Sequence, residues 1–206
     1  MNGSSSERMS KKKKDDSARM SLFDWLQCGV VAIVAAIFIF IFLGRIIGVD
    51  GISMMDTLHH NDRVIVSNLF YTPKNGDIII FQPDRDNHTG TPLVKRVIAT
   101  AGQVIDINFE TGAVSVAEDA HSPGELLDEP YILEPTHSRS DFRGPLEIPE
   151  GYIFVMGDNR NHSSDSRSST VGVVDTRLIL GRVLFLFVPG TENDGMRDWS
   201  RFGPVH

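Results

Sequence analysis

The chain has one cysteine, no repeat of fixed period and no metal-ligand spacing, and each absence narrows its class. The lone Cys28 cannot form an internal disulfide, so the fold stands without covalent crosslinks. The seven histidines are scattered through polar stretches, and no cysteine or carboxylate pattern completes a metal site around them. We therefore predict no catalytic metal and no other cofactor.

Positive charge is also scarce beyond the N-terminus. The whole chain carries 20 Lys and Arg against 27 Asp and Glu, a formal net charge of -7. Residues 1–24 carry six basic residues, among them Lys11 to Lys14, against four acids, whereas the chain after residue 45 is acidic. This asymmetry indicates that the two parts face different surroundings, and we expect no nucleic-acid partner.

One long apolar run interrupts this polar chain. The residues from Trp25 to Gly44 are apolar except for Gln27, and at 1.5 Å per residue they match the hydrocarbon core of a bilayer, about 30 Å thick. We predict a transmembrane anchor helix over residues 25–47. A buried core helix would show a polar stripe, and no small-x-small pair precedes a plausible cut before Val49, so a cleaved leader is disfavoured.

The positive-inside rule orients this anchor. Lys11 to Lys14 place the N-terminus in the cytoplasm, although Arg45 just past the apolar run reduces the charge difference. Residues 1–24 are therefore predicted to form a disordered cytoplasmic tail. The chain after residue 48 is expected outside the cytoplasm, on a protein that crosses the plasma membrane once.

Beyond the anchor, short runs rich in Val, Ile and Phe recur between turn residues. This spacing predicts a mainly β domain, an antiparallel sheet or barrel, over residues 48–190. A polar, proline-bearing excursion occupies about residues 118–149, and residues 191–206 form a tail without a usable pattern. The expected strands are Arg63–Ser67, Asp77–Gln82, Leu93–Ala99, Gln103–Asn108, Ala113–Val116, Tyr152–Met156 and Leu178–Val188.

Ser53 is a candidate nucleophile and Lys95 a candidate base. A hydroxyl attacks an amide only when a base removes its proton. In the predicted strand, alternation places Lys95 on the apolar face shared with Leu93 and Val97. Desolvation there can lower a lysine pKa by up to about 3 to 5 units, which makes a serine-lysine dyad feasible. A lysine whose ammonium reaches solvent from a sheet edge is the alternative.

The most distinctive stretch is an eleven-residue polar run after the predicted strand Tyr152–Met156. Such a composition is ordinarily a solvated turn. Two upstream motifs, Ser53-Met54 and Lys95-Arg96, favour a functional interpretation instead. The run is Gly157-Asp158-Asn159-Arg160-Asn161-His162-Ser163-Ser164-Asp165-Ser166-Arg167.

These motifs, in this order and separation, resemble those of the bacterial type I signal peptidases, in the single-anchor form of Gram-positive bacteria. The resemblance implies a β-rich catalytic domain in which Ser53 is the nucleophile, Lys95 is the general base and no metal takes part. It further implies that Ser163 hydrogen-bonds and orients Lys95. Other residues of the run would support the site through ion pairs: Asp158, Arg160, Asp165 and Arg167.

The resemblance also locates the oxyanion and substrate regions. Gly51 stands where some family members carry a second serine, so the backbone around Gly51 and Ser53 is expected to supply the donors. An extended peptide is expected to bind beside five residues that form shallow pockets. They are Met54, Met55, Pro92, Leu93 and Val94. For the two methionines, ordinary apolar packing is an equal alternative.

Substrates and partners follow from the same resemblance. They are secretory preproteins that bear signal peptides cut after a small-x-small site, the lipid bilayer, and the export machinery by proximity. The nucleophile stands a few residues beyond the anchor, which confines enzyme and signal peptide to one interface.

Three departures from the family pattern leave other functions open. Asp56 and Ala101 stand where proline is usual, and Leu93 where tyrosine is usual. They favour, as one alternative, a specialised maturation protease with few substrates, such as pilin or conjugation proteins. A catalytically silent anchored β module that binds exported chains is another. The self-cleaving repressors, a further serine-lysine class, would need a DNA-binding region.

Overall fold

The computed structural model describes residues 24–37, 44–83, 90–191 and 195–205. Residues 24–37 are helical, and the chain divides into two units, residues 1–43 and 44–206. No helix within the described ranges combines the length and the apolar character that a bilayer crossing requires. The basic tail up to residue 23 and residues 38–43 of the predicted anchor lie outside the described residues.

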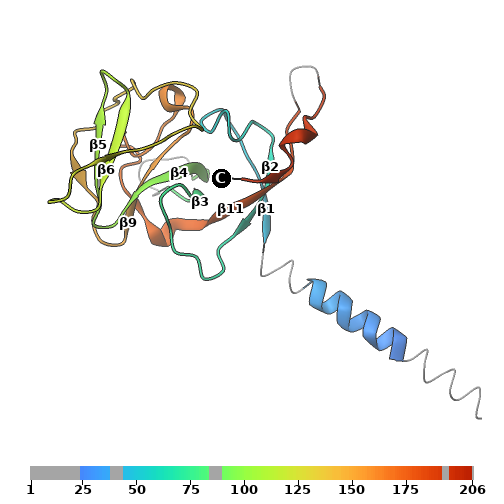
Figure 1. The fold of residues 1–206 in the computed structure, drawn as a ribbon. Coiled ribbons are helices and arrows are strands. Elements are labelled where there is room, and N and C mark those ends of the chain that lie inside the picture. The colour runs from blue at the N-terminus through green and yellow to red at the C-terminus, as the bar shows by residue number, and fades with distance from the viewer. Residues whose placement is uncertain (1–23, 38–43, 84–89, 192–194, 206) are drawn as a thin grey trace, which may run out of the picture. The chain divides into compact units, whose positions relative to one another are not determined.

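The second unit is built on an eight-stranded antiparallel sheet (Figure 1). Its strands follow the order β1-β2-β11-β3-β4-β9-β10, and β12 pairs with β11. Because β11 lies between β2 and β3, the last third of the chain pairs with its first third. The bounds are β1 Arg45–Gly48, β2 Arg63–Ser67, β3 Ile78–Phe81, β4 Leu93–Thr100, β9 Tyr152–Met156, β10 Val174–Asp175, β11 Ile179–Val188 and β12 Gly203–Pro204.

The burial of these strands explains their sequences. In β2, Val64 and Val66 are buried while their neighbours are more exposed, which is the alternation of a strand with one face on the core. In β3, all four apolar residues are buried, because the strand lies between β11 and β4. This difference places β3 and β4 at the centre of the sheet.

A second sheet of four strands, in the order β7-β6-β5-β8, lies in the middle of the sequence. Its buried residues Ile105, Ile107, Val114 and Val116 belong to one core cluster with Phe154 of β9. This shared core joins the two sheets. The bounds are β5 Val104–Asn108, β6 Ala113–Ala117, β7 Glu125–Leu126 and β8 Leu146–Glu147.

The predicted antiparallel β domain is confirmed, and all seven predicted strands are present with small shifts at their ends. The predicted end of the anchor helix at residue 47 is wrong, because residues 45–47 belong to β1 and pair with β2. The predicted C-terminal tail is also structured in part. A short 3-10 helix, Trp199–Arg201, and β12 lie against the domain, and Arg201 donates to the buried Asp62 at 2.7 Å.

The polar excursion contains β7 and β8 but is otherwise loop. Its path is fixed by contacts with other elements, such as the hydrogen bond from the Thr136 N–H to the Gly112 oxygen at 3.0 Å. Local periodicity carries no trace of these contacts, which is why the sequence predicts only an irregular segment here.

Candidate active site

Ser53 and Lys95 meet although 42 residues separate them in the chain. Ser53 lies in the loop between β1 and β2, and Lys95 is the third residue of β4. The Nζ of Lys95 donates to the Ser53 Oγ at 2.7 Å and to the Val94 carbonyl oxygen at 2.9 Å. This is hydrogen-bond contact between a hydroxyl and an amine, the geometry that proton transfer between them requires.

The Lys95 amine is almost fully buried, with 2% of the residue exposed. Burial lowers the pKa of Lys95 from 10.5 to about 8, and the negative charges of Asp165 and Asp158 oppose part of this change. At pH 7 about a tenth of the amine is therefore neutral, and the neutral form dominates above pH 8. The prediction that Lys95 lies on an apolar strand face agrees with this burial.

Asn159 orients the loop that carries Ser53. Its backbone N–H donates to the Ser53 carbonyl oxygen at 3.0 Å, and its side-chain Nδ2 donates to the Ile52 carbonyl oxygen at 3.1 Å. The Gly51 N–H donates to Nδ1 of His60 at 3.3 Å. Since Gly51 is already engaged, the N–H of Ser53 is the better placed candidate to donate to a developing oxyanion.

Asp158 joins three parts of the site. It forms a bidentate ion pair with Arg96, through distances of 2.8 Å and 2.7 Å, and both side chains are buried. Its second oxygen accepts a hydrogen bond from the Thr57 hydroxyl at 2.5 Å. Because Arg96 follows Lys95 and Thr57 follows the Ser53 turn, Asp158 ties the polar run to both candidate residues.

Asp165 and Arg167 form a second buried ion pair, at 2.8 Å between Arg167 Nη2 and Asp165 Oδ2. The same Asp165 oxygen accepts from the Gly157 N–H at 3.0 Å, and Arg167 donates to the Arg160 carbonyl oxygen at 2.6 Å. These bonds fold the polar run back on itself. They therefore hold its shape, which agrees with the support role inferred from the resemblance.

Gly157 lies where no side chain fits. A Cβ built on it would stand 2.4 Å from the Ser53 carbonyl oxygen and 2.3 Å from the Ser163 Oγ. Real Cβ contacts do not approach so closely, so even alanine would push apart the Ser53 loop and the polar run. The glycine at the start of the run is therefore required by close approach.

Ser163 does not make the predicted hydrogen bond to Lys95 in this structure. Its Oγ is buried, and no described residue serves as its partner. The two hydrogen bonds of the Lys95 amine go to Ser53 and Val94 instead. The reason is geometric: β4 carries the amine toward the Ser53 loop, and the Val94 carbonyl takes the second bond.

A cavity of about 160 Å³ adjoins the Ser53-Lys95 pair. Of the five residues predicted to contact substrate, Met54, Pro92, Leu93 and Val94 line it, whereas Met55 does not. Met54 is itself 1% exposed and packs in a core cluster, so it forms the floor of the cavity. The substrate contact of Met55 stays a prediction, since this residue does not line the cavity.

The histidines near Ser53 lie next to carboxylates. His59 lies 3.0 Å from Asp56, and His60 lies 3.0 Å from Asp50. Within the described ranges, no group of three or more His, Cys, Asp or Glu side chains is arranged to hold a metal ion. The polar groups that meet beside the cavity are the Ser53 hydroxyl, the Lys95 amine and backbone groups.

Several residues at the site escape the sequence-based interpretation. Asn159 and Gly157 belong to the polar run, so the motif singled out the run that contains them but did not predict their contacts with the Ser53 loop. Glu129 forms a bidentate ion pair with Arg160 at 2.9 Å and 2.6 Å, and nothing in the local sequence indicates it. Long-range pairing of this kind leaves no mark on periodicity.

Comparisons with known proteins agree on one family. A family model described as "Signal peptidase, peptidase S26" matches residues 22–188. "Signal peptidase I" of Bacillus licheniformis is 34% identical over 191 residues, which cover 87% of this chain and 96% of that protein. "Signal peptidase I S" of Bacillus subtilis is 33% identical, covering 88% and 97%. "Probable signal peptidase I-1" of Synechocystis is 34% identical, covering 84% and 83%.

Proposed function

Since the chain belongs to the bacterial type I signal peptidases, peptidase S26, it is a peptidase that removes signal peptides from preproteins, and we propose that Ser53 and Lys95 carry out the cleavage. The observation that carries this proposal is the 2.7 Å hydrogen bond between the Lys95 amine and the Ser53 hydroxyl. No other amine or imidazole is recorded within hydrogen-bond reach of that hydroxyl among the described residues.

In the proposed mechanism, the neutral amine of Lys95 removes the Ser53 proton as the Oγ attacks the scissile carbonyl carbon. The resulting ammonium returns a proton to the leaving amine, which leaves an acyl-enzyme ester on Ser53. Water, deprotonated by the same amine, then hydrolyses the ester. The lowered pKa of Lys95 supports this cycle, because a base acts best when its pKa lies near the working pH.

Charge that develops on the carbonyl oxygen needs donors fixed in advance. We assign the backbone N–H of Ser53 to this role. Asn159 supports the assignment, because its two hydrogen bonds hold the carbonyl groups of Ile52 and Ser53 and so orient the peptide units around the nucleophile. A preorganised donor of this type is worth about 2.7 to 4 kcal/mol in the transition state.

The cavity beside the dyad suits a narrow side chain in an extended substrate. The cavity has a volume of about 160 Å³, and its wall includes β4 at Leu93 and Val94, which can pair with an added strand. We propose that this wall binds the residues before the cut and selects small side chains there. Cleavage after small-x-small sites is part of this proposal.

We further propose that residues 25–44 anchor the protein in the plasma membrane, with residues 1–24 in the cytoplasm and the β domain outside. The support is the apolar sequence and the basic residues that precede it. Lipid and the export machinery would then be neighbours of the enzyme rather than ligands of its site.

The decisive test is cleavage of a preprotein by the full chain in detergent, compared with Ser53→Ala and Lys95→Ala. We expect each variant to lose activity by at least about 10⁴-fold, because neither half of a nucleophile-base pair works alone. Thermal unfolding of each variant serves as the control for folding. Retained turnover in both variants would show that the dyad assignment is wrong.

One observation favours a narrower substrate range. Asp56, where the family usually has proline, is exposed beside the Ser53 loop and pairs with His59. An acid there would disfavour acidic residues next to the cut. Rates on several preproteins, compared between the wild type and Asp56→Pro, distinguish a specialised maturation protease from a general signal peptidase.

A further inference from the structure

An aromatic ring from the polar excursion lies against two buried arginines of the site. The guanidinium carbon of Arg96 is 3.8 Å from the centre of the Tyr131 ring, and that of Arg160 is 5.9 Å from it. Both arginines are 1% exposed. A guanidinium over an aromatic face is attracted to it, and the attraction grows when both groups are removed from water.

Tyr131 itself is held by a hydrogen bond to Glu129. Its hydroxyl donates to Glu129 Oε1 at 3.1 Å, and the Glu129 carboxylate also accepts two hydrogen bonds from Arg160. Burial and the Glu129 charge raise the pKa of the Tyr131 hydroxyl to about 12. The ring is therefore a neutral phenol at working pH, and the only charges in the cluster are the paired ones.

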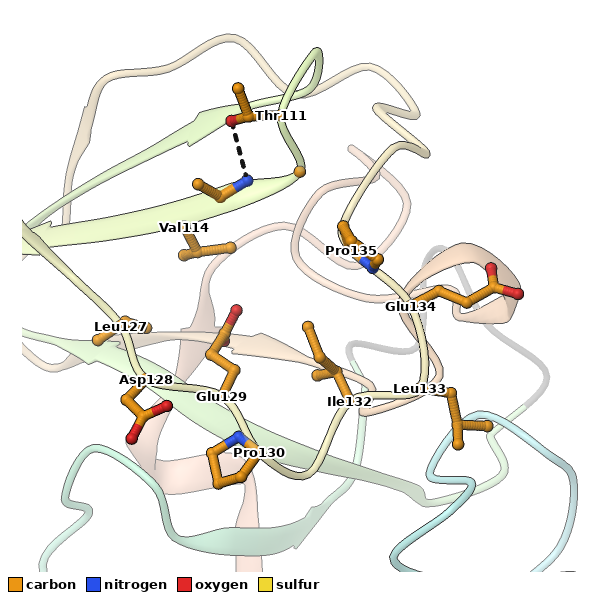
Figure 2. Close-up of a pocket in the computed structure, with 12 residues that line it drawn as sticks. Thr111, Val114, Leu127, Asp128, Glu129, Pro130, Ile132, Leu133, Glu134 and Pro135 are labelled. Carbon is orange, nitrogen blue, oxygen red and sulfur yellow. Dashed lines mark hydrogen bonds between the residues drawn. The ribbon is translucent and has the colours of Figure 1, made fainter.

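The segment that carries Glu129 and Tyr131 is fixed to the rest of the domain. Figure 2 shows it passing the hairpin turn at Thr111, with the Glu129 carboxylate turned inward and those of Asp128 and Glu134 turned outward. Next to this turn, a Cβ on Gly112 would collide with Pro135 at 2.3 Å. Because this segment packs closely against the hairpin, the backbone that carries Tyr131 is held in place.

The same arginines contact the groups that support the dyad. Arg96 pairs with Asp158, which holds Thr57, while Arg160 donates to the Gly157 carbonyl oxygen at 3.1 Å. Gly157 packs directly against Ser53. A shift of either guanidinium therefore moves the polar run relative to Ser53 and Lys95.

We propose that Tyr131 is a positioning residue for the reaction: its ring, in contact with Arg96 and near Arg160, keeps the polar run aligned with the Ser53-Lys95 pair. This inference rests on the proposed function of that pair. It gives the polar excursion a role in catalysis without any contact to substrate. Since the ring acts through alignment, its loss lowers kcat and leaves KM nearly unchanged.

The test compares Tyr131→Leu with Tyr131→Phe in the full chain, by steady-state cleavage of a preprotein. Leucine fills much of the space but offers no π face, and we expect kcat to fall about tenfold with KM changed less than about twofold. Phenylalanine keeps the face and loses only the bond to Glu129, so it should restore most of kcat.

A matched control separates positioning from stability. Val114→Ala removes buried volume from the core next to the same segment and touches neither arginine, so it should lower the melting temperature with kcat unchanged. An unchanged kcat in Tyr131→Leu, or an equal loss in Val114→Ala at matched stability, would overturn the proposal. Failure of the dyad itself has a different signature, which is full activity in Ser53→Ala and Lys95→Ala.

Discussion

Lys95 and Arg96 are neighbours on β4 and equally buried, yet the fold treats their charges in opposite ways. Arg96 forms a bidentate ion pair with Asp158 and stacks on Tyr131. Lys95 forms no ion pair within the described part of the chain, and its amine bonds to a hydroxyl and a carbonyl oxygen. Arg96 therefore has a counter-charge in direct contact, and Lys95 has none among the described residues.

The difference agrees with the role proposed for each residue. A buried guanidinium stays charged, so it is stable only when a carboxylate compensates for the lost water. An amine that must act as a base needs the reverse, because a carboxylate in contact would raise its pKa. The polar run therefore concentrates its carboxylates on arginines and leaves them at a distance from Lys95.

The largest expected change in stability comes from removing the carboxylate that pairs with Arg96. In Asp158→Ala, Arg96 is left buried without its counter-charge, which should cost about 3 to 5 kcal/mol in the free energy of unfolding. Urea denaturation measures this loss. Asp175→Ala is the matched control, because its partner Arg177 is exposed and its pair should contribute little. Equal losses in the two variants would contradict the comparison.

Replacing the Lys95 amine, which contacts no described counter-charge, should raise the free energy of unfolding. Lys95→Met abolishes activity but should raise the free energy of unfolding at pH 7 by about 2 kcal/mol, since the wild type loses stability by holding a buried amine. A base with a lowered pKa destabilises the fold fully below the folded pKa, here about 8. That penalty disappears as the pH rises toward the unfolded value of 10.5.

The measurement for this variant is denaturation of wild type and Lys95→Met at pH 7 and near pH 10. The difference between the two proteins should shrink at the higher pH. A constant difference would mean that the Lys95 pKa is not lowered by the fold.

The same pKa predicts the pH dependence of cleavage. Because only the neutral amine accepts the Ser53 proton, kcat/KM should fall about tenfold for each pH unit below about 8 and level off above it. A pH-rate profile on one preprotein checks this limb. A rate independent of pH from mildly acidic to alkaline conditions would exclude a lysine base.

The smallest effect concerns the hydroxyl that has no partner. Ser163→Ala removes a buried Oγ that has no described partner, and it should raise the free energy of unfolding by about 1 kcal/mol. If Ser163 orients Lys95 in the presence of substrate, kcat falls in the same variant. A loss of stability would show instead that the hydroxyl is bonded in solution.

The sequence predicts the scaffold of this site well and its support poorly. Alternating and continuous apolar runs predicted seven strands, because side-chain burial in a sheet has a period that a local window contains. The three motifs singled out Ser53, Lys95 and the polar run. They could not show that Ser163 finds no partner among the described residues, since that depends on small distances between distant segments.

By itself, the sequence determined the class of the protein: a mainly β peptidase of the signal peptidase family, with one serine and one lysine marked by their motifs. Only the tertiary structure decided that Lys95 is buried against Ser53 without a counter-charge, and that Glu129 and Tyr131 return from the polar excursion to contact Arg160 and Arg96. Motifs and periodicity are local properties of a chain. The pKa of Lys95 and the alignment of the polar run depend on the groups that the fold packs against them. Here those groups come from separate parts of the sequence.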